Sequence, residues 1–234
     1  AAEQVGCDIE QVLPFSTGVI LEPLPVQKII DALPDVKPVH WSEAARAIMT
    51  TDTVPKAASR ETKVGNSHTV RATGIAKGSG MICPNMATMI SVVLCDAWVE
   101  PELWQKLFSQ AVGKTFNRVS VDGDTSTNDT VYGLANGASG VAATEEDIPA
   151  LLDALTGVLG ELAYMLVRDG EGATKVMHIN VTGAKNDEQA ELVARTIGHS
   201  SLVKTAIYGH DANWGRIVAA IGRSGADFDP NQVR

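Results

Sequence analysis

Apolar residues recur every three to four positions in several stretches of the chain, which is the spacing of one face of a helix. The longest of these stretches, residues 145–167, carries six leucines and predicts an amphipathic helix. Another helix is predicted to begin at Pro101, and its aromatic side chains lie beside the apolar stripe, which places them in a core. Residues 25–33 and 42–49 predict two shorter helices, the second with Ser42 as its N-cap.

Strand patterns alternate with these helices. Residues 67–76 are rich in small and β-branched side chains, and residues 89–99 form the more apolar run that a sheet buried on both faces requires. Apolar and polar residues alternate over 175–182, which predicts a third strand, and a capping box opening at Asn186 begins a helix that ends at Gly198. Because this order has no strict strand–helix–strand rhythm, the predicted fold class is α/β, built in α+β layers.

The charge of the chain narrows its expected partners. Lys and Arg number 19 against 28 Asp and Glu, which gives a formal charge of −9 and a pI near 5.0. A binding surface for nucleic acid or for an anionic membrane is therefore not expected. The sequence shows no signal peptide and no uninterrupted apolar run of the roughly 20 residues that a membrane span needs. It predicts a cytoplasmic protein that binds small molecules or other proteins.

The cysteines and acidic clusters do not predict a metal or a cofactor. The three cysteines lack C-x-x-C spacing, so neither disulfides nor a zinc site is predicted. Asp122, Asp124 and Asp129 are spaced like calcium ligands, but their loop lacks the Gly and the Glu of an EF-hand. Hydrogen bonds from these side chains to the backbone of a turn explain the loop's composition better.

Candidate chemistry lies in the segment KGSGMICPNMATM, residues 77–89. Two glycines and a proline before an apolar strand allow a strained backbone. The Thr88 hydroxyl can attack the carbonyl of Ala87, form an ester by an N-to-O acyl shift, and become a new N-terminus after hydrolysis. Its α-amino group, with an ordinary pKa of about 7.7 to 8.0, can then activate its own hydroxyl. Taken alone, the residue types fit an ordinary Gly/Pro loop better.

Five sequence blocks favour the self-cleaving threonine over an ordinary loop. The segment KGSGMICPNMATM resembles the cleavage segment of the glutamate N-acetyltransferase (ornithine acetyltransferase) family. The other blocks of that family follow in the same order, as PFSTGVI at 14–20, IMTTDTVPK at 48–56, VDGDTSTNDT at 121–130 and RDGEGATK at 168–175. Together they span most of the chain, so the resemblance is specific.

The resemblance implies an N-terminal-nucleophile-type fold and an enzyme of arginine biosynthesis that moves acetyl from N2-acetylornithine to glutamate. It implies a precursor that cuts itself between Ala87 and Thr88. Residues 1–87 would then end an α subunit and residues 88–234 would begin a β subunit, in an α2β2 heterotetramer. The family's late Asn and Ser or Thr have no counterpart before Arg234. An incomplete stretch of a longer precursor is therefore expected, and acetyl-CoA stays open as a second acetyl donor.

The resemblance also assigns the site residues. The nucleophile maps to Thr88 and the oxyanion hole to Thr17 and Gly18, while the substrate contacts map to Thr51, Lys77, Thr88 and Glu171. An ammonium and a carboxylate suit the two charged ends of an amino-acid substrate.

Two other functions stay open on the residues alone. A self-processing amidase or aminopeptidase would share the chemistry as far as the acyl-enzyme and then pass the acyl group to water. A non-catalytic amino-acid-binding protein would keep the bond between Ala87 and Thr88 intact. The mass of the denatured protein separates this last possibility from the two enzymes.

Overall fold

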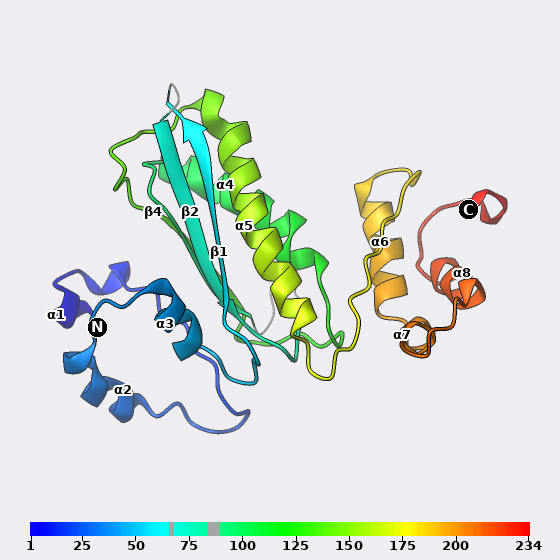
Figure 1. Ribbon diagram of the computed structural model, residues 1–234, viewed down its shortest axis with the longest axis horizontal. Coiled ribbons are helices and arrows are strands. Elements are labelled where there is room, and N and C mark those ends of the chain that lie inside the picture. The colour runs from blue at the N-terminus through cyan, green and yellow to red at the C-terminus, as the bar shows by residue number, and fades with distance from the viewer. Residues whose placement is uncertain (66–67, 84–88) are drawn as a thin grey trace.

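A four-stranded sheet lies at the centre of the computed structural model, which describes residues 1–65, 68–83 and 89–234 (Figure 1). Its strands follow the order β1 (Lys56–Val64), β2 (His68–Lys77), β3 (Ile90–Cys95) and β4 (Thr130–Ala135). The first two pairs of neighbours are antiparallel, and β3 and β4 are parallel. This mixed sheet and its helices confirm the predicted α/β class. They also confirm the strand predicted over 67–76, which ends one residue later at Lys77, and a shorter strand inside the predicted segment 89–99.

Helices α4 (Pro101–Lys114) and α5 (Ile148–Arg168) form the main core with the sheet (Figure 1). The leucine stripe predicted from the sequence is the buried face of α5, where Leu159 and Leu162 are fully buried. Gly74 on β2 permits this close packing, because a Cβ there would lie 3.0 Å from Leu162 Cδ1. By length and composition alone α5 is apolar enough to cross a membrane. Its leucine stripe instead packs on the sheet, as expected of a core helix.

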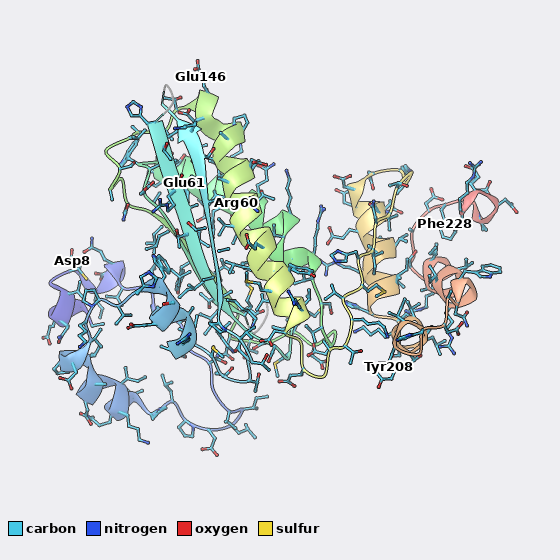
Figure 2. All side chains as sticks on the ribbon, viewed as in Figure 1. Asp8, Arg60, Glu61, Glu146, Tyr208 and Phe228 are labelled. Carbon is cyan, nitrogen blue, oxygen red and sulfur yellow. The ribbon has the colours of Figure 1, made fainter. Side chains whose placement is uncertain are left out.

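The outer face of α5 contacts β1 through a charged side chain. Arg60 lies across the helix at Gly157, where an added Cβ would fall 2.5 Å from Arg60 Nε (Figure 2). The Arg60 guanidinium lies 3.7 Å from the Glu161 carboxylate, and both side chains are about half exposed. Such a surface ion pair contributes about 0 to 1 kcal/mol, so the apolar stripe supplies most of the helix–sheet stability.

The N-terminal part consists of α1 (Ala2–Val5), α2 (Val26–Ala32) and α3 (Trp41–Ala47). Of these, α3 packs against β1 and β2 and buries Ala45 completely. The prediction that Ser42 caps this helix is wrong, because the helix begins one residue earlier. The N-cap is His40, whose ring Nδ1 accepts the backbone N–H of Ser42 at 3.3 Å. The described residues also include five short 3-10 helices, at Ile9–Gln11, Leu33–Asp35, Phe116–Arg118, Glu145–Asp147 and Pro230–Gln232.

Three C-terminal helices form a second apolar cluster, α6 (Asp187–Gly198), α7 (Ser201–Tyr208) and α8 (Trp214–Gly222). Half of the predicted capping box is confirmed, because the Asn186 side chain accepts the backbone N–H of Gln189 at 2.9 Å. The other half is not formed, because the Gln189 side chain accepts the backbone N–H of Asp227 at 2.8 Å. The prediction of a strand over 175–182 is wrong, because the structure assigns no strand there. The apolar residues of that alternation pack against the helices of the second cluster, and they include Met177 and Ile179.

Candidate functional site

One end of the sheet gathers the strand ends that carry the candidate chemistry. At this end β1 begins at Lys56, β2 ends at Lys77, β3 begins at Ile90 and β4 begins at Thr130. The register pairs Lys77 with Ile90 and Ile90 with Thr130, so these residues lie side by side across three strands. The predicted cleavage residues Ala87 and Thr88 lie outside the described residues. Met89, which follows Thr88 in the chain, leads into β3 at this end.

Residues of the loop 121–130 hold both flanks of the predicted cleavage segment. The Asp122 carboxylate accepts the backbone N–H groups of Met81 at 2.6 Å and Ile82 at 3.1 Å. Met81 has a φ of 55°, a left-handed conformation that non-glycine residues rarely adopt. On the other flank, the backbone N–H of Met89 donates to the Asp129 carboxylate. These bonds confirm the expected role of two acidic side chains, Asp122 and Asp129, as acceptors for backbone N–H groups, and they hold a strained turn in place.

The structure brings the predicted residues Thr51 and Glu171 together around Ser79 and Gly80. Thr51 Oγ1 lies 2.7 Å from Ser79 Oγ, and the backbone N–H of Glu171 donates to Ser79 O at 2.8 Å. A Cβ on Gly80 would lie 2.6 Å from the Glu171 carboxylate, so only glycine leaves that carboxylate its present place. Thr51, Ser79 and Glu171 line a cavity of about 430 Å³. Ser79 is therefore a candidate site residue that the sequence did not predict.

Lys77 is buried at the end of β2, with 3% of its surface exposed. Burial lowers the pKa of its ammonium, while the negative charges of Asp52 and Asp129 raise it and the positive charge of Lys56 lowers it further. An ammonium that is buried away from water is stabilised by a nearby anion. This position therefore suits the carboxylate of a bound substrate.

A buried ion network supports this end of the sheet, and the sequence reasoning missed its members. Lys56 Nζ lies 2.6 Å from Asp52 Oδ1 and 2.6 Å from Asp169 Oδ2, and the lysine is fully buried. Asp52 also accepts the backbone N–H of Gly78 at 2.6 Å. The network therefore joins three segments of the chain that carry Thr51, Lys77 and Glu171.

The pKa of both carboxyls in this network is lowered. Burial alone would raise the pKa of Asp52, but hydrogen bonds from Lys56 and from the backbone N–H groups of Gly78 and Thr50 outweigh it. The pKa of Asp169 falls against burial in the same way, through Lys56 and both donors of Thr53. Both carboxylates are therefore ionised at neutral pH.

The predicted oxyanion residues Thr17 and Gly18 follow a segment that is attached to the start of β4. Tyr132 donates its hydroxyl to Pro14 O at 2.8 Å, and Asn128 Nδ2 donates to Ser16 O at 3.2 Å. Thr17 is half-buried and Gly18 is exposed. Since Asn128 directly precedes Asp129, the segment reaches the same end of the sheet as Lys77.

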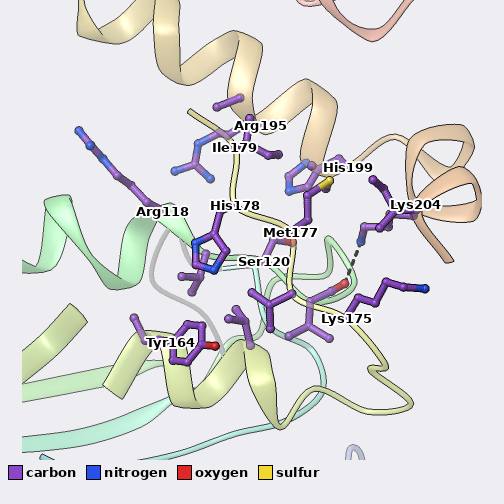
Figure 3. Close-up of a pocket in the computed structure, with 18 of the residues that line it drawn as sticks. Arg118, Ser120, Tyr164, Lys175, Met177, His178, Ile179, Arg195, His199 and Lys204 are labelled. Carbon is purple, nitrogen blue, oxygen red and sulfur yellow. Dashed lines mark hydrogen bonds between the residues drawn. The ribbon is translucent and has the colours of Figure 1, made fainter. Parts of the chain in front are cut away.

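A larger cavity of about 970 Å³ lies between α5 and the helices α6 and α7 (Figure 3). Tyr164 and His178 stack in it with ring centroids 5.8 Å apart, and His199 Nε2 lies 3.3 Å from Cys83 Sγ. Among the predicted site residues that the structure describes, Glu171 alone lines this cavity. We place the candidate site at the sheet end instead, because the buried charges and the sequence blocks meet there. Across residues 1–65, 68–83 and 89–234, no group of three His, Cys, Asp or Glu side chains is arranged to hold a metal.

Comparisons with known proteins agree on one family. The ArgJ family pattern matches residues 1–234. The chain is 62% identical over 232 residues to the arginine biosynthesis bifunctional protein ArgJ of Nitratidesulfovibrio vulgaris, covering 97% of this chain and 59% of that protein. It is 53% identical over 238 residues to the ArgJ protein of Neisseria meningitidis, covering 100% of this chain and 59% of that protein. The chain thus spans 59% of the length of these two relatives.

A solved structure shares the fold. The crystal structure of the arginine biosynthesis bifunctional protein ArgJ from Bacillus halodurans matches with a TM-score of 0.55 and 48% sequence identity. The match covers 57% of this chain and 64% of that chain.

Proposed function

Because this chain belongs to the ArgJ family, we propose that it is part of a glutamate N-acetyltransferase of arginine biosynthesis. The enzyme would transfer acetyl from N2-acetyl-L-ornithine to L-glutamate through Thr88. The observation that supports this most strongly is the meeting of separate sequence blocks at one end of the sheet. Four distant parts of the chain reach this end of the sheet, and they carry Lys77, Thr51, Glu171 and the segment before Thr17.

We also propose self-cleavage between Ala87 and Thr88, giving fragments that stay together as α and β subunits. The cut would fall between β2 and β3, which pair from Ala72 with Cys95 to Lys77 with Ile90. Both fragments would therefore contribute strands to one sheet and side chains to one core. The same proposal extends to an α2β2 assembly in the cytoplasm.

The proposed reaction has two steps. The Thr88 α-amino group takes the proton of its own hydroxyl while the oxygen attacks the acetyl carbonyl of acetylornithine, and Thr17 and Gly18 donate hydrogen bonds to the oxyanion. The ornithine amine then leaves with that proton, and the acetyl group stays on Thr88 as an ester. In the second step the glutamate amine attacks the ester carbonyl and the bond from that carbonyl to the Thr88 oxygen breaks. The Thr88 α-amino group takes a proton from the attacking amine and passes it to the Thr88 oxygen, which restores the free hydroxyl. Lys77 and Glu171 would hold the carboxylate and the amino end of the substrate.

The proposal is tested by incubating the full-length protein with acetylornithine alone and measuring the masses of its fragments. We expect two fragments divided at residue 88, with one acetyl group on the fragment that begins there, and parallel initial-rate lines with glutamate. Intersecting lines with no acetylated fragment would indicate direct transfer in a ternary complex. Acetate release without glutamate would indicate an amidase, and a single uncut chain would indicate a binding protein. Labelling by acetyl-CoA would identify it as a second donor.

Replacing Thr17 by Val should lower kcat and kcat/KM together by about 10² to 10³, because the lost donor matters most when the oxyanion forms. The measurement uses only protein whose mass shows complete cleavage, since one oxyanion hole could serve both reactions. Ser16→Ala removes a hydroxyl one residue earlier and should leave both constants unchanged. A fully cleaved Thr17→Val enzyme with normal kcat would show that Thr17 is not an oxyanion donor.

A further inference from the structure

Asp129 binds Met89, the second residue after the proposed cleavage bond. Its Oδ1 accepts the backbone N–H of Met89, and the next backbone N–H, of Thr130, donates to Met89 O at 2.9 Å. The second carboxylate oxygen, Oδ2, is buried and has no hydrogen-bond partner among the described residues. A buried acceptor without a partner costs about 1 to 3 kcal/mol. We therefore expect its donor to come from outside the described residues.

The surroundings of Asp129 favour a positively charged donor. Burial raises the pKa of this carboxyl to about 6, while the Met89 N–H and the charge of Lys77 act in the opposite direction. The ammonium of Lys77 on β2 is the charge that lowers the pKa of Asp129. The pKa of Lys77 is in turn shifted by the charges of Asp52 and Lys56. Above pH 6 the side chain is thus an incompletely compensated anion, and a cation at Oδ2 would stabilise it.

Self-cleavage would create such a cation within reach. The Met89 nitrogen is separated from the amino group of residue 88 by one Cα and one carbonyl carbon, so bond lengths limit their distance to about 4 Å. The Met89 nitrogen is itself hydrogen-bonded to Asp129. A new α-amino group at residue 88 would therefore arise close to a buried carboxylate oxygen that needs a donor.

We propose that Asp129 is a positioning residue for the amino terminus created at residue 88, with Oδ1 holding the Met89 N–H and Oδ2 accepting from the α-amino group. This inference rests on the proposed function. When the amine takes the hydroxyl proton, it becomes an ammonium, and the carboxylate stabilises that charge until the proton passes to the leaving ornithine amine. Asp129 gains and loses no proton in the cycle, and it acts on the reacting hydroxyl through the amine.

Asp129→Asn in the full-length protein removes the negative charge of the carboxylate and nearly preserves the shape of the side chain. The amide oxygen of Asn can still accept the Met89 N–H, so the start of β3 keeps its hydrogen bond. We expect kcat to fall by about 10- to 100-fold with little change in KM, which is the range for a lost hydrogen bond to a charged group. An adjacent anion raises the pKa of an amine, and Asp129→Asn removes that anion. The acidic limb of the pH profile of kcat/KM should therefore move to lower pH by about one unit.

Asp124→Asn is the matched control, since it makes the same change at an exposed carboxylate of the same loop. It should alter neither kcat nor the pH profile. A purely structural role of Asp129 would change the melting temperature and leave the acidic limb in place. An Asp129→Asn enzyme with normal kcat and an unmoved acidic limb would overturn the inference.

A measurement on the unaltered enzyme keeps the test decisive if Asp129→Asn does not fold. The rate at which the α-amino group of residue 88 reacts with an acylating reagent, followed against pH, gives its pKa. We expect a value above the ordinary range of about 7.7 to 8.0, and a value within or below that range would contradict the inference. An unaltered protein that is uncut or transfers no acetyl overturns the proposed function and this inference together. An active cleaved enzyme with an ordinary amine pKa overturns this inference alone.

Discussion

Replacing Thr88 by Ala should leave the full-length protein as one chain and lower acetyl transfer by roughly 10⁶-fold, the loss seen when an enzyme's covalent nucleophile is removed. The same hydroxyl would attack the Ala87 carbonyl during cleavage and carry the acetyl group during transfer, so one substitution removes both reactions. Intact mass under denaturing conditions measures the first effect, and initial rates with acetylornithine and glutamate measure the second.

The flanking contacts make this a test of chemistry and not of folding. Met81 and Ile82 on one side and Met89 on the other are held by side chains of the loop 121–130, which Thr88→Ala leaves in place. Thr88→Ser keeps a hydroxyl and should still cut, while Thr127→Ala, an exposed residue of that loop, should cut normally. Cleavage of Thr88→Ala at the same bond would show that another group, or a protease, makes the cut.

The helices were predictable because their apolar spacing coincides with their packing. The leucine stripe of α5 is continuous over the helix, and no competing pattern occurs in that stretch. The strand β1 was not predictable in the same way. Its sequence KAASRETKV is mostly polar, and only Lys56, Ala58 and Val64 are buried. An edge strand with one open face gives a weak pattern, and pairing with β2 along its whole length fixes it.

The error at residues 175–182 has a related cause. Alternation of apolar and polar residues reports that one face is buried, but it does not say whether a strand or a helix covers that face. Met177, Ile179 and Val181 are indeed on an apolar face, and they contact the cluster of α6 to α8. A strand needs a neighbouring strand as well, and local sequence carries no information on that neighbour.

Some residues of the candidate site were predictable from the sequence, and others depend on contacts between distant parts of the chain. Family blocks placed Thr51, Lys77 and Glu171, and the structure brings Thr51 and Glu171 to one cavity and Lys77 to the adjoining strand end. The blocks could not show that Lys56 bridges two carboxylates, because Asp169 lies 113 positions away in the chain. The sequence predicted that Asp129 serves backbone groups and is not a metal ligand, but it could not identify Met89 as the partner, since that contact depends on the parallel pairing of β3 and β4.

Replacing Lys56 by Met should lower the free energy of unfolding by about 3 to 5 kcal/mol, the cost of removing one partner from a buried ion pair. Met is close in length to the lysine stem, so little packing is lost, but Asp52 and Asp169 keep their burial without their cation. Denaturant unfolding of the variant and the unaltered protein at neutral pH measures the difference. Lys63→Met is the matched control on the same strand, because Lys63 is exposed, and it should change stability by less than about 1 kcal/mol.

The pH dependence of this loss identifies its origin. The pKa of each carboxyl is lowered in the folded protein, so the network contributes its full stability above the unfolded-state pKa of about 3.9. That contribution is lost as the pH falls through the lowered folded-state pKa, since protonated carboxyls no longer pair with Lys56. The difference between the unaltered protein and Lys56→Met should therefore shrink in acid, and adding Asp52→Asn and Asp169→Asn to the variant should recover part of it at neutral pH. A loss at neutral pH no larger than that of Lys63→Met, or one that does not change with pH, would show that the network does not hold this end of the sheet together.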